Sequence, residues 1–516
     1  SRSFDGLNNP QNLALSFKYA KASGMIAQGA LSVTYSPVHT VAYYVDLADK
    51  YVELGAQEIC IKDMAGIGRP VSIGKMVKGI RDRHPDIIIQ YHGHSTPGFS
   101  VASSLEAARN GADIIDVGME PLSWGTGHAD LLTIHEMLKD AGFSLPEINH
   151  RAYMKVRALT QSFIDDFLGE YINPKNRYMN SLLIGPGLPG GMMGSLMADL
   201  ENNVASLSRW LAKNGKNKVD QEELLIALFE EVKVVWPKLG YPPLVTPFSQ
   251  YVKNVSLMNV INSYKGKKRF AMIDENTWGM ILGKSGRLPG KLDDEILAMA
   301  ENQGREFYNG NPQDLYPDEL ELYRQKMKEK GWDLGRDEED LMEYAMHPAQ
   351  YEAYKSGEAK RKFEEDLVKR KSERSNSVDT NISPVAISQD ATNLQPKALD
   401  LNINGEKYHI KISYPDGIQQ DNTRTQPIVS MPPPSSTIPN GNYVVAPLEG
   451  RFYLTKEAGE RGKKVGDKVT EGDTVGYIEA MKVINAITTD VSGEIVEILV
   501  NHGEDIDEDD HLFKIV

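Results

Sequence analysis

The chain has 516 residues, a net charge of −15 and 41% hydrophobic residues, which is enough for two or three domains with large cores. The acidic excess argues against partners such as nucleic acid or an anionic membrane surface. No run of 18 or more apolar residues occurs, so we expect no membrane-spanning segment. The single cysteine, Cys60, lies in an apolar run. It excludes a disulfide framework, predicts a buried thiol and fits a cytoplasmic location.

The first residues look like the interior of a domain. The chain starts with Ser1 rather than Met and shows no signal-peptide pattern. Residues 2–8 read Arg-Ser-Phe-Asp-Gly-Leu-Asn, and a helical pattern follows almost at once. We therefore expect the sequence to be truncated at its N-terminus.

Residues 26–118 alternate between apolar strands and amphipathic helices. The expected strands cover residues 26–34, 58–63, 87–92 and 113–118, and the expected helices cover residues 38–54, 72–83 and 101–110. Apolar strands separated by helices of this length indicate parallel βα units that are buried on both faces. A helical stretch over 129–179 and a further strand at 181–184 are expected next.

Two architectures fit this alternation, a doubly wound sheet and a (β/α)8 TIM barrel. No Gly-x-Gly-x-x-Gly fingerprint follows a first strand, which disfavours a dinucleotide-binding sheet. Polar residues gather where the expected strands end, namely Lys62, Asp63, His92, His94 and Asp116. Barrel enzymes place their chemistry at these C-terminal strand ends. We therefore predict an α/β fold with a (β/α)8 barrel that lacks its first strands and retains about six of the eight units.

The rest of the chain divides into a helical part, a linker and a C-terminal all-β domain. Residues 196–371 are mainly helical in pattern, and Asp220 is the expected N-cap of a helix over 220–236. The next segment is rich in Ser, Asn and Pro and predicts a flexible linker with a short β-hairpin at 398–414. The expected domains are the incomplete barrel at 1–195, the helical domain at 196–371, the linker at 372–440 and the β domain at 441–516.

The β domain contains the tetrapeptide Glu-Ala-Met-Lys at residues 479–482. Short strands are expected on both sides of it, over 475–479 and 486–489, with Lys482 at the tip of the hairpin. A lysine at such a tip is exposed and can accept an amide-linked cofactor. An ordinary surface lysine in a β-turn is the simpler interpretation, and the flanking sequence argues against it.

The flanking sequence repeats itself in two halves. Gly450 corresponds to Gly493 and Gly466 to Gly503. The acidic segment Glu-Gly-Asp at residues 471–473 corresponds to Glu-Asp-Asp at residues 508–510. Two similar half-domains that meet at a hairpin predict the flattened β-sandwich of biotinyl and lipoyl domains. Residues 441–516 resemble the biotin carboxyl carrier family, with a short insertion near 456–463. The resemblance implies biotin bound covalently to Lys482 by a biotin protein ligase.

The polar strand ends suggest a metal site. His92 and His94 alternate along a strand, so both side chains point to the same face, which is the lumen in a barrel. Two imidazoles suit a divalent zinc, manganese or cobalt ion, although they also fit ordinary hydrogen-bonded histidines. Lys62 ends the preceding strand, and a lysine in a lumen needs a partner. Two solutions remain open, an ion pair with Asp63 and carbamylation, which converts the amine into an anionic metal ligand.

A series of short motifs occurs in order along residues 1–355. They are Phe4-Asp5-x-Leu7-Asn8, Lys62-Asp63-Met64-Ala65-Gly66, His92-x-His94, Leu188-Pro189-Gly190-Gly191, Gly240-Tyr241-Pro242-Pro243-Leu244-Val245-Thr246-Pro247, Gly286-Arg287-x-Pro289 and Glu338-Glu339-Asp340-x-x-x-Tyr344-Ala345. As a set they resemble the carboxyltransferase part of pyruvate carboxylase and of the oxaloacetate decarboxylase alpha chain. The similarity is greatest to separate subunits with a C-terminal biotinyl domain, because the chain has no ATP-grasp biotin carboxylase.

This resemblance implies a biotin-dependent carboxyltransferase with a barrel followed by a helical domain. The enzyme would move a carboxyl group between carboxybiotin on Lys482 and a 2-oxo acid, pyruvate or oxaloacetate, through a metal-stabilised enolate. It implies that His92, His94 and a carbamylated, catalytic Lys62 bind the metal, and that Arg2 binds the substrate. The implied partners are a separate biotin carboxylase subunit or membrane subunits of a decarboxylase, and further copies of the chain in a homo-oligomer.

Three positions depart from the family pattern. The family's fourth metal ligand is an Asp on a first barrel strand that this sequence does not contain. The family's proton-shuttling Thr corresponds to Gly194, with Ser195 next to it, and Ser95 stands where an Asp usually follows the second histidine. Two alternatives therefore remain open, a carboxyltransferase for a different acceptor and a non-catalytic carrier or scaffold subunit. A barrel metallolyase without biotin is a third, against which the carrier domain argues.

Overall fold

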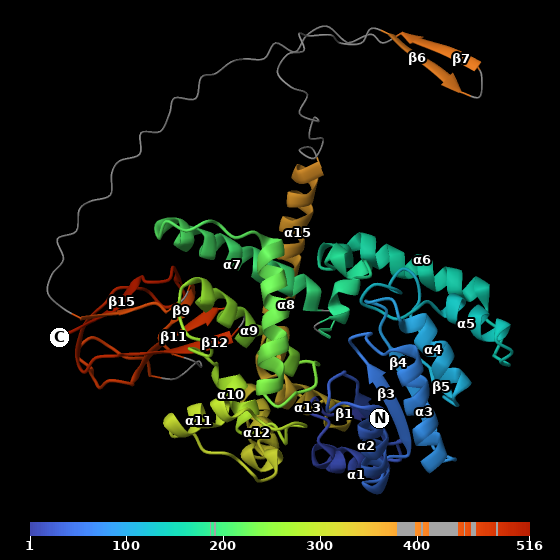
Figure 1. The fold of residues 1–516 in the computed structure, drawn as a ribbon, viewed down its shortest axis with the longest axis horizontal. Helices are drawn as coiled ribbons and strands as arrows, with labels where there is room; N and C mark the ends of the chain where they lie inside the picture. The colour runs from blue at the N-terminus through green and yellow to red at the C-terminus, as the bar shows by residue number, and fades with distance from the viewer. Residues whose placement is uncertain are drawn as a thin grey trace. The chain divides into compact units, whose positions relative to one another are not determined.

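The structure is a computed structural model that describes residues 1–185, 187–189, 192–378, 398–403, 406–411, 442–447, 449–455, 461–480 and 483–516. It divides into two compact units, Ser1–Lys355 with Gly441–Val516 and Ser356–Asn440. The first unit contains a parallel sheet, a helical region and a β-sandwich, and the second contains one helix and a two-stranded hairpin (Figure 1). Within the described residues, no helix is both long and apolar enough to cross a membrane.

The N-terminal part forms a five-stranded sheet in which every neighbouring pair is parallel. Its strands are β1 (Arg2–Phe4), β2 (Gln28–Ser32), β3 (Glu58–Asp63), β4 (Ile88–Gly93) and β5 (Ile114–Ile115). Consecutive strands are neighbours in the sheet, in the order β1 to β5 (Figure 1). This order is that of a β/α barrel, so the predicted fold class is confirmed.

The crossovers between these strands are helical. The helices are η1 (Pro10–Leu13), α1 (Ala14–Ala22), α2 (Val41–Glu53), α3 (Pro70–Arg83) and α4 (Ser100–Arg109), and α5 (Leu131–Asp140) and α6 (His150–Asp166) follow β5. Apolar side chains of β3 and β4, such as Ile59, Ile61 and Ile89, form one core with Tyr44 of α2 and Met76 of α3. The helices therefore cover one face of the sheet.

The other face of the sheet is polar, which corrects the expectation of strands that are apolar throughout. Side chains alternate along a strand, so Lys62 lies on the face opposite to Ile59 and Ile61. Gln28 and Gln90 also lie on this polar face, where the Gln28 amide donates to Gln90 Oε1 at 2.8 Å. In a barrel this is the lumen face, and it carries the side chains that can bind ligands or take part in catalysis.

One element prediction in this region was wrong, and one strand was not predicted. Residues 181–184 are not a strand but the 3-10 helix η4 (Ser181–Ile184), because the side chain of Asn180 accepts from the Leu182 amide at 3.0 Å and starts a helical turn. The short strand β1, which pairs with β2 through Arg2 and Gln28, was not predicted. A strand of three residues is too short for a periodic pattern to reveal.

The helical region follows the sheet in the chain. Its helices are η2 (Leu168–Glu170), η3 (Pro174–Arg177), α7 (Met193–Lys213), α8 (Gln221–Lys238), α9 (Phe248–Tyr264), α10 (Glu275–Ile281), α11 (Asp294–Asn302), η6 (Pro312–Leu315), α12 (Leu320–Lys330), η7 (Arg336–Glu338), α13 (Glu339–Met346) and α14 (Pro348–Lys355). Buried Leu228 and Val252 belong to its core. Asp220 is the N-cap of α8 as predicted, and it accepts from the Glu223 amide at 2.7 Å.

The last part of the region predicted to be helical over 196–371 contains three helices, α13, α14 and α15 (Glu358–Val378). His347 leaves the helical region with φ −138° and ψ 60°, as a residue before a proline tends to do. Gly357 has φ +76°, which ends the next helix. α15 belongs to the second unit and continues past the predicted end at residue 371.

The second unit also contains β6 (Ala398–Ile403) and β7 (Glu406–Lys411), which form an antiparallel pair. These strands confirm the predicted hairpin. The turn of this hairpin, at residues 404–405, lies outside the described residues, as does most of the linker predicted over 372–440.

The C-terminal part is a sandwich of two four-stranded sheets, in the orders β10-β13-β15-β8 and β12-β11-β9-β14. The strands are β8 (Asn442–Val445), β9 (Gly450–Tyr453), β10 (Lys468–Val469), β11 (Thr474–Ala480), β12 (Val483–Thr488), β13 (Gly493–Ile498), β14 (Asp505–Ile506) and β15 (His511–Ile515). Exchanging β8–β11 with β12–β15 converts one strand order into the other. The predicted two-fold repeat and flattened sandwich are therefore confirmed.

The repeated glycines have a packing role in the sandwich. Gly450 begins β9 and Gly493 begins β13. A Cβ atom on Gly450 would lie 2.5 Å from the carbonyl oxygen of Glu479, and one on Gly493 would lie 2.6 Å from Ile515 Cγ2. Both positions therefore exclude a side chain, which explains why the same residue recurs in the two halves.

Candidate active site

The polar face of the sheet brings together four of the five residues predicted for the site. Lys62 in β3 pairs in register with His92 in β4, and Lys62 Nζ lies 3.4 Å from His92 Nε2. His94 follows β4 directly, and the ring centroids of His92 and His94 are 5.2 Å apart. Arg2 reaches the same place from β1, with Nη1 3.2 Å from His92 Nδ1. The structure therefore places Arg2, Lys62, His92 and His94 in one cluster.

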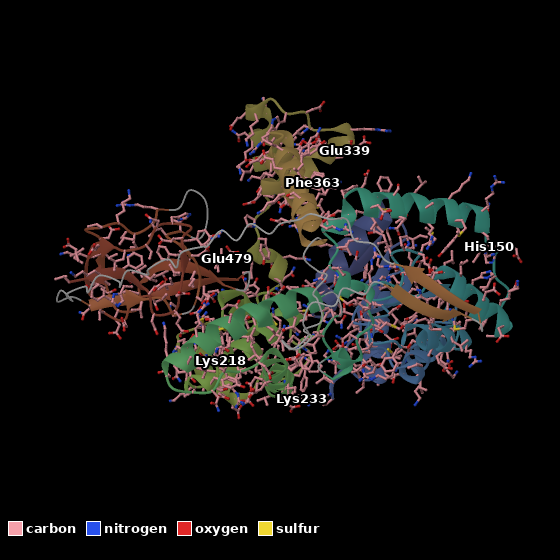
Figure 2. The ribbon with its side chains drawn as sticks, turned by 90° about the horizontal axis from the view of Figure 1, so that it is seen from above. His150, Lys218, Lys233, Glu339, Phe363 and Glu479 are labelled. Carbon is pink, nitrogen blue, oxygen red and sulfur yellow. The ribbon has the colours of Figure 1, made fainter. Side chains whose placement is uncertain are left out.

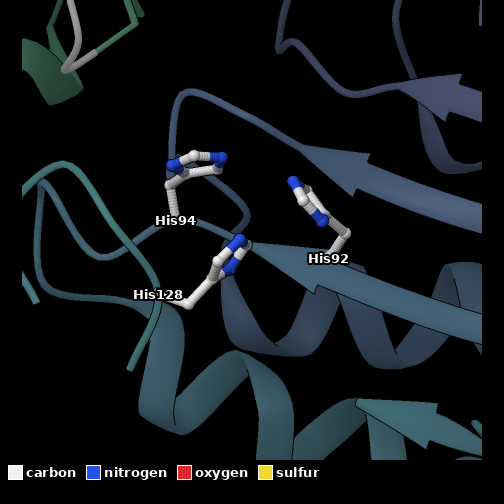
Figure 3. Close-up of side chains that lie close together, drawn as sticks. All are labelled: His92, His94 and His128. Atoms are coloured by element: carbon white, nitrogen blue, oxygen red, sulfur yellow. The ribbon is translucent and has the colours of Figure 1, made fainter. Parts of the chain in front are cut away.

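A third histidine, His128, joins this cluster, and the sequence analysis did not identify it. It lies in the loop between β5 and α5 and forms an antiparallel bridge with His94. Its ring centroid is 4.4 Å from that of His92 and 4.6 Å from that of His94. Figure 3 shows the three rings around a common space. The only sequence signal was a histidine in a glycine-rich loop, and the strand bridge that positions it is a long-range contact.

The three imidazoles have their Nδ1 atoms held by oxygen atoms. The pairs are His92 with Asp116 Oδ2 at 2.6 Å, His94 with the Thr126 carbonyl at 2.6 Å, and His128 with the Gly93 carbonyl at 2.8 Å. A carbonyl only accepts, so the Nδ1 atoms of His94 and His128 donate and their Nε2 atoms keep the lone pair. Burial lowers the pKa of both His92 and His94, that of His94 to about 4, which keeps the rings neutral near pH 7.

This donor set fits a divalent metal ion. The three histidines offer ligand atoms that all lie within 4.8 Å of one another, and the three side chains are half-buried. Neutral imidazoles are ligands for zinc, manganese and cobalt. Histidines that bind metals usually donate their second ring nitrogen to a carboxylate or a backbone carbonyl, as these do.

Asp116 connects the histidines to Arg2. Its Oδ2 atom accepts from Arg2 Nη1 at 3.0 Å as well as from His92, and Gln90 Nε2 donates to Oδ1. Burial alone would raise the pKa of Asp116, but hydrogen bonds from His92, Gln90 and Arg2 outweigh burial and hold the pKa below its ordinary value. Arg2 Nε also donates to Gln28 Oε1 at 2.5 Å. The predicted substrate-binding arginine is thus part of a hydrogen-bonded network.

Lys62 and Asp63 point to opposite faces of the sheet, so the ion pair between them, one of the two solutions left open for Lys62, does not form. The Asp63 carboxylate is buried and accepts from the amides of Ile67 at 3.0 Å and Gly68 at 2.7 Å. Burial raises its pKa to about 6. Lys62 Nζ instead lies 5.3 Å from the centroid of the Phe4 ring, and burial lowers the pKa of its amine. A lowered pKa increases the share of neutral amine, which is the form that reacts with CO₂.

Three other residues singled out in the sequence, Cys60, Ser95 and Gly194, lie outside the histidine cluster. Cys60 is fully buried on β3, as predicted, and burial raises the pKa of its thiol to about 12. Ser95 follows His94 and is also buried, and its hydroxyl shares a hydrogen bond of 2.8 Å with Ser100. Gly194 lies in the first turn of α7.

The fifth predicted residue, Lys482, lies outside the described residues. β11 ends at Ala480 and β12 begins at Val483, and these two residues pair with each other. Ala480 is preceded on β11 by Glu479, which Figure 2 labels. Its Oε2 atom accepts from the Tyr453 hydroxyl at 2.9 Å. The two strands predicted on either side of the attachment site are therefore confirmed.

Three protein families match consecutive parts of the chain. They are the families described as HMGL-like over residues 11–160, conserved carboxylase domain over residues 212–412 and biotin-requiring enzyme over residues 443–515. The structure also resembles the carboxyl transferase domain of Rhizobium etli pyruvate carboxylase, which was solved with oxamate and biotin. The TM-score is 0.56 at 22% identity, and the match covers 69% of this chain and 58% of that one. This likeness supports the fold.

Similar sequences carry related names. A protein of Methanocaldococcus jannaschii that is named as a pyruvate carboxylase subunit is 29% identical over 93% of this chain and 75% of its own length. The methylmalonyl-CoA carboxyltransferase 5S subunit of Propionibacterium freudenreichii is 31% identical over 67% of this chain and 64% of its own length. With a β/α sheet that bears a metal-type cluster and a biotin-requiring domain, this chain belongs to the family of biotin-dependent carboxyltransferase subunits.

Proposed function

We propose that this enzyme moves a carboxyl group between biotin attached to Lys482 and a small 2-oxo acid, with pyruvate and oxaloacetate as the reacting pair. The observation that carries the proposal is the convergence of Lys62, His92 and His94 on the polar face of the sheet, in a chain that also has a biotin-requiring domain. The name of the relative from Methanocaldococcus jannaschii supports pyruvate as the acceptor.

The proposal includes a divalent zinc, manganese or cobalt ion, held by His92, His94 and carbamylated Lys62. Carbamylation joins the neutral amine of Lys62 to CO₂ and releases one proton, so the lowered pKa of this amine favours it. A bound ion would supply Lewis-acid chemistry by polarising the 2-oxo carbonyl, which is worth several kcal/mol at the transition state.

Arg2 binds the carboxylate of the 2-oxo acid in this proposal. Its side chain is 30% exposed, and its guanidinium already lies beside His92. A guanidinium can bind a carboxylate with two parallel hydrogen bonds, which orients the substrate as well as holding it. The transfer then replaces a proton on the methyl carbon of pyruvate by the carboxyl group, and the proton ends on the nitrogen that released the carboxyl group.

A second candidate is the same transfer to a different acceptor. Gly194 supports it, because a glycine offers no hydroxyl where the family has its proton-shuttling Thr. One similar sequence, 25% identical, is the 2-oxoglutarate carboxylase large subunit of Hydrogenobacter thermophilus. Isotope exchange of the carboxyl group, measured in parallel with pyruvate and with 2-oxoglutarate, separates the two candidates. The true acceptor should support exchange at a lower substrate concentration than the other 2-oxo acid.

The proposal extends to partners and organisation. Two relatives are named as single subunits of a pyruvate carboxylase, which supports a separate biotin carboxylase subunit as the partner, and membrane decarboxylase subunits are the alternative. Biotin protein ligase, further copies of the chain in a homo-oligomer and a cytoplasmic location complete the proposal. The functional division is a barrel part at 1–195, a helical domain at 196–371, a linker at 372–440 and a carrier at 441–516.

Replacing Lys482 tests the proposal directly. Lys482→Arg keeps the positive charge but removes the amine that biotin acylates, so both streptavidin reactivity and carboxyl exchange with pyruvate should fall to background. Lys468→Arg, in β10 of the same sandwich, is the matched control and should leave both signals unchanged. Exchange that persists in Lys482→Arg would contradict the carrier role of this lysine.

A further inference from the structure

The loop that carries His128 is held in place by bonds from both sides. The Ser95 amide donates to the Gly127 carbonyl at 2.7 Å, and the Trp124 amide donates to the His128 carbonyl at 2.7 Å. Asp130 anchors the end of the loop, since it bridges to Gly118 and its side chain accepts from the Leu132 amide at 2.9 Å. His128 is therefore positioned by the backbone, as a binding residue needs to be.

The ring nitrogens of His128 have different surroundings. Nδ1 is held by the Gly93 carbonyl, which belongs to the strand that carries His92. This bond leaves Nε2 as the acceptor nitrogen. The rings of His92 and His94 lie within 4.6 Å of the His128 ring, centroid to centroid. Three imidazoles whose ligand atoms all lie within 4.8 Å of one another form a set that one cation could bind.

We propose that His128 is a third imidazole ligand of the metal ion, beside His92 and His94. Zinc binds imidazole nitrogen at about 2.0–2.1 Å, so two nitrogens on one ion lie at most about 4.2 Å apart. The three ligand atoms lie within 4.8 Å of one another, which is close to this limit. A carbamylated Lys62 then completes a four-ligand site made of residues of this chain. The inference rests on the proposed function for its metal, and it adds a ligand to that site.

Ring packing is the competing explanation for His128. The His92 and His128 rings meet edge to face at 76°, which is an ordinary aromatic arrangement. His128→Phe separates the two roles, because phenylalanine keeps a ring in this place and removes the nitrogen. His128→Ala serves as a second variant in case the larger ring disturbs the loop. His150→Ala is the matched control, since His150 is an exposed histidine at the start of α6 (Figure 2).

The experiment uses the full chain, stripped with a chelator and titrated with zinc ions against a chromogenic competitor. The native chain and His150→Ala should bind one zinc ion with equal affinity, and X-ray absorption of both zinc forms should count three imidazoles. His128→Phe and His128→Ala should bind zinc at least about tenfold more weakly, which is the smallest loss seen when a metal site loses even an outer partner. Their zinc forms should show two imidazoles.

Two results would overturn the inference. One is a count of two imidazoles in the native chain, and the other is unchanged zinc affinity in both His128 variants while circular dichroism shows them folded. These readouts do not depend on activity. A chain that binds zinc through three imidazoles but shows no carboxyl exchange would contradict the proposed function and leave the role of His128 intact.

Discussion

The parallel sheet and the β-sandwich place their chemistry in opposite ways. In the sheet, the candidate residues Lys62 and His92 belong to regular strands and share a register pair. In the sandwich, the inner faces are apolar, with Phe452, Ile478 and Phe513 fully buried, and the attachment tetrapeptide begins where β11 ends. In the sheet, the candidate site residues thus lie on the strands that also build the fold. In the sandwich, the attachment lysine lies outside the strands that form the core.

This difference has an energetic reason. Polar groups on a half-buried face are stable only when hydrogen-bonded, and the sheet meets this requirement with the network of Arg2, Gln28, Gln90 and Asp116. The sandwich needs no such network because its core contains apolar side chains. We therefore expect substitutions in the sandwich core to change stability alone, and substitutions in the polar network to change metal binding first.

The largest effect on stability is expected for Ile478→Ala. Ile478 is fully buried at the centre of the sandwich core, and shortening such a side chain costs about 2–5 kcal/mol of unfolding free energy. Denaturant unfolding of the full chain should show an earlier transition for the sandwich, and streptavidin reactivity should fall with it. Zinc affinity should stay unchanged.

Val496→Ala is the control for this prediction, because Val496 on β13 is 40% exposed. It should shift the transition far less than Ile478→Ala does. A parallel loss of zinc affinity in Ile478→Ala would show that the sandwich and the sheet are not independent.

A smaller effect is expected for Asp116→Asn. The substitution preserves shape but removes the charge that holds His92 Nδ1 at 2.6 Å and Arg2 Nη1 at 3.0 Å. Loss of such an outer partner weakens metal binding by about 10- to 100-fold. Zinc titration of the stripped chain measures this change, and the sandwich transition should not move.

Asp113→Asn offers a matched control in the same strand region. The Asp113 carboxylate accepts from Arg81 Nη2 at 2.6 Å and from the Ile89 amide at 2.8 Å. These contacts include none with the histidines, so zinc affinity should stay at the native value. If Asp113→Asn weakened zinc binding as much as Asp116→Asn, a general loosening of β5 would explain both results.

The sequence predicted the sheet and the sandwich for different reasons. The strands at 58–63 and 87–92 followed from apolar runs between helical patterns, and the structure has β3 and β4 there. The sandwich followed from the repeated glycines at 450 and 493, which close packing requires. Both signals are local or periodic, so one sequence is enough to reveal them.

The features that the sequence did not predict depend on contacts between distant residues or are too short to show a pattern. His128 reaches the cluster through a bridge to His94, and no local pattern specifies such a bridge. The contribution of Gln28 and Gln90 to the polar face was also missed, because each occupies a single position in a strand that otherwise looks apolar. β1 was missed because three residues carry no period.

The smallest effect is expected for Tyr453→Phe, which tests the sandwich side of the comparison. The Tyr453 hydroxyl donates to Glu479 Oε2 at 2.9 Å, next to the attachment tetrapeptide. This bond is only partly buried, so water can replace the lost partner, and neither the sandwich transition nor streptavidin reactivity should change measurably. A clear fall in streptavidin reactivity with unchanged stability would show that Glu479 must be held for biotin attachment. In that case the sandwich, like the sheet, would position its chemistry through a hydrogen bond between strands.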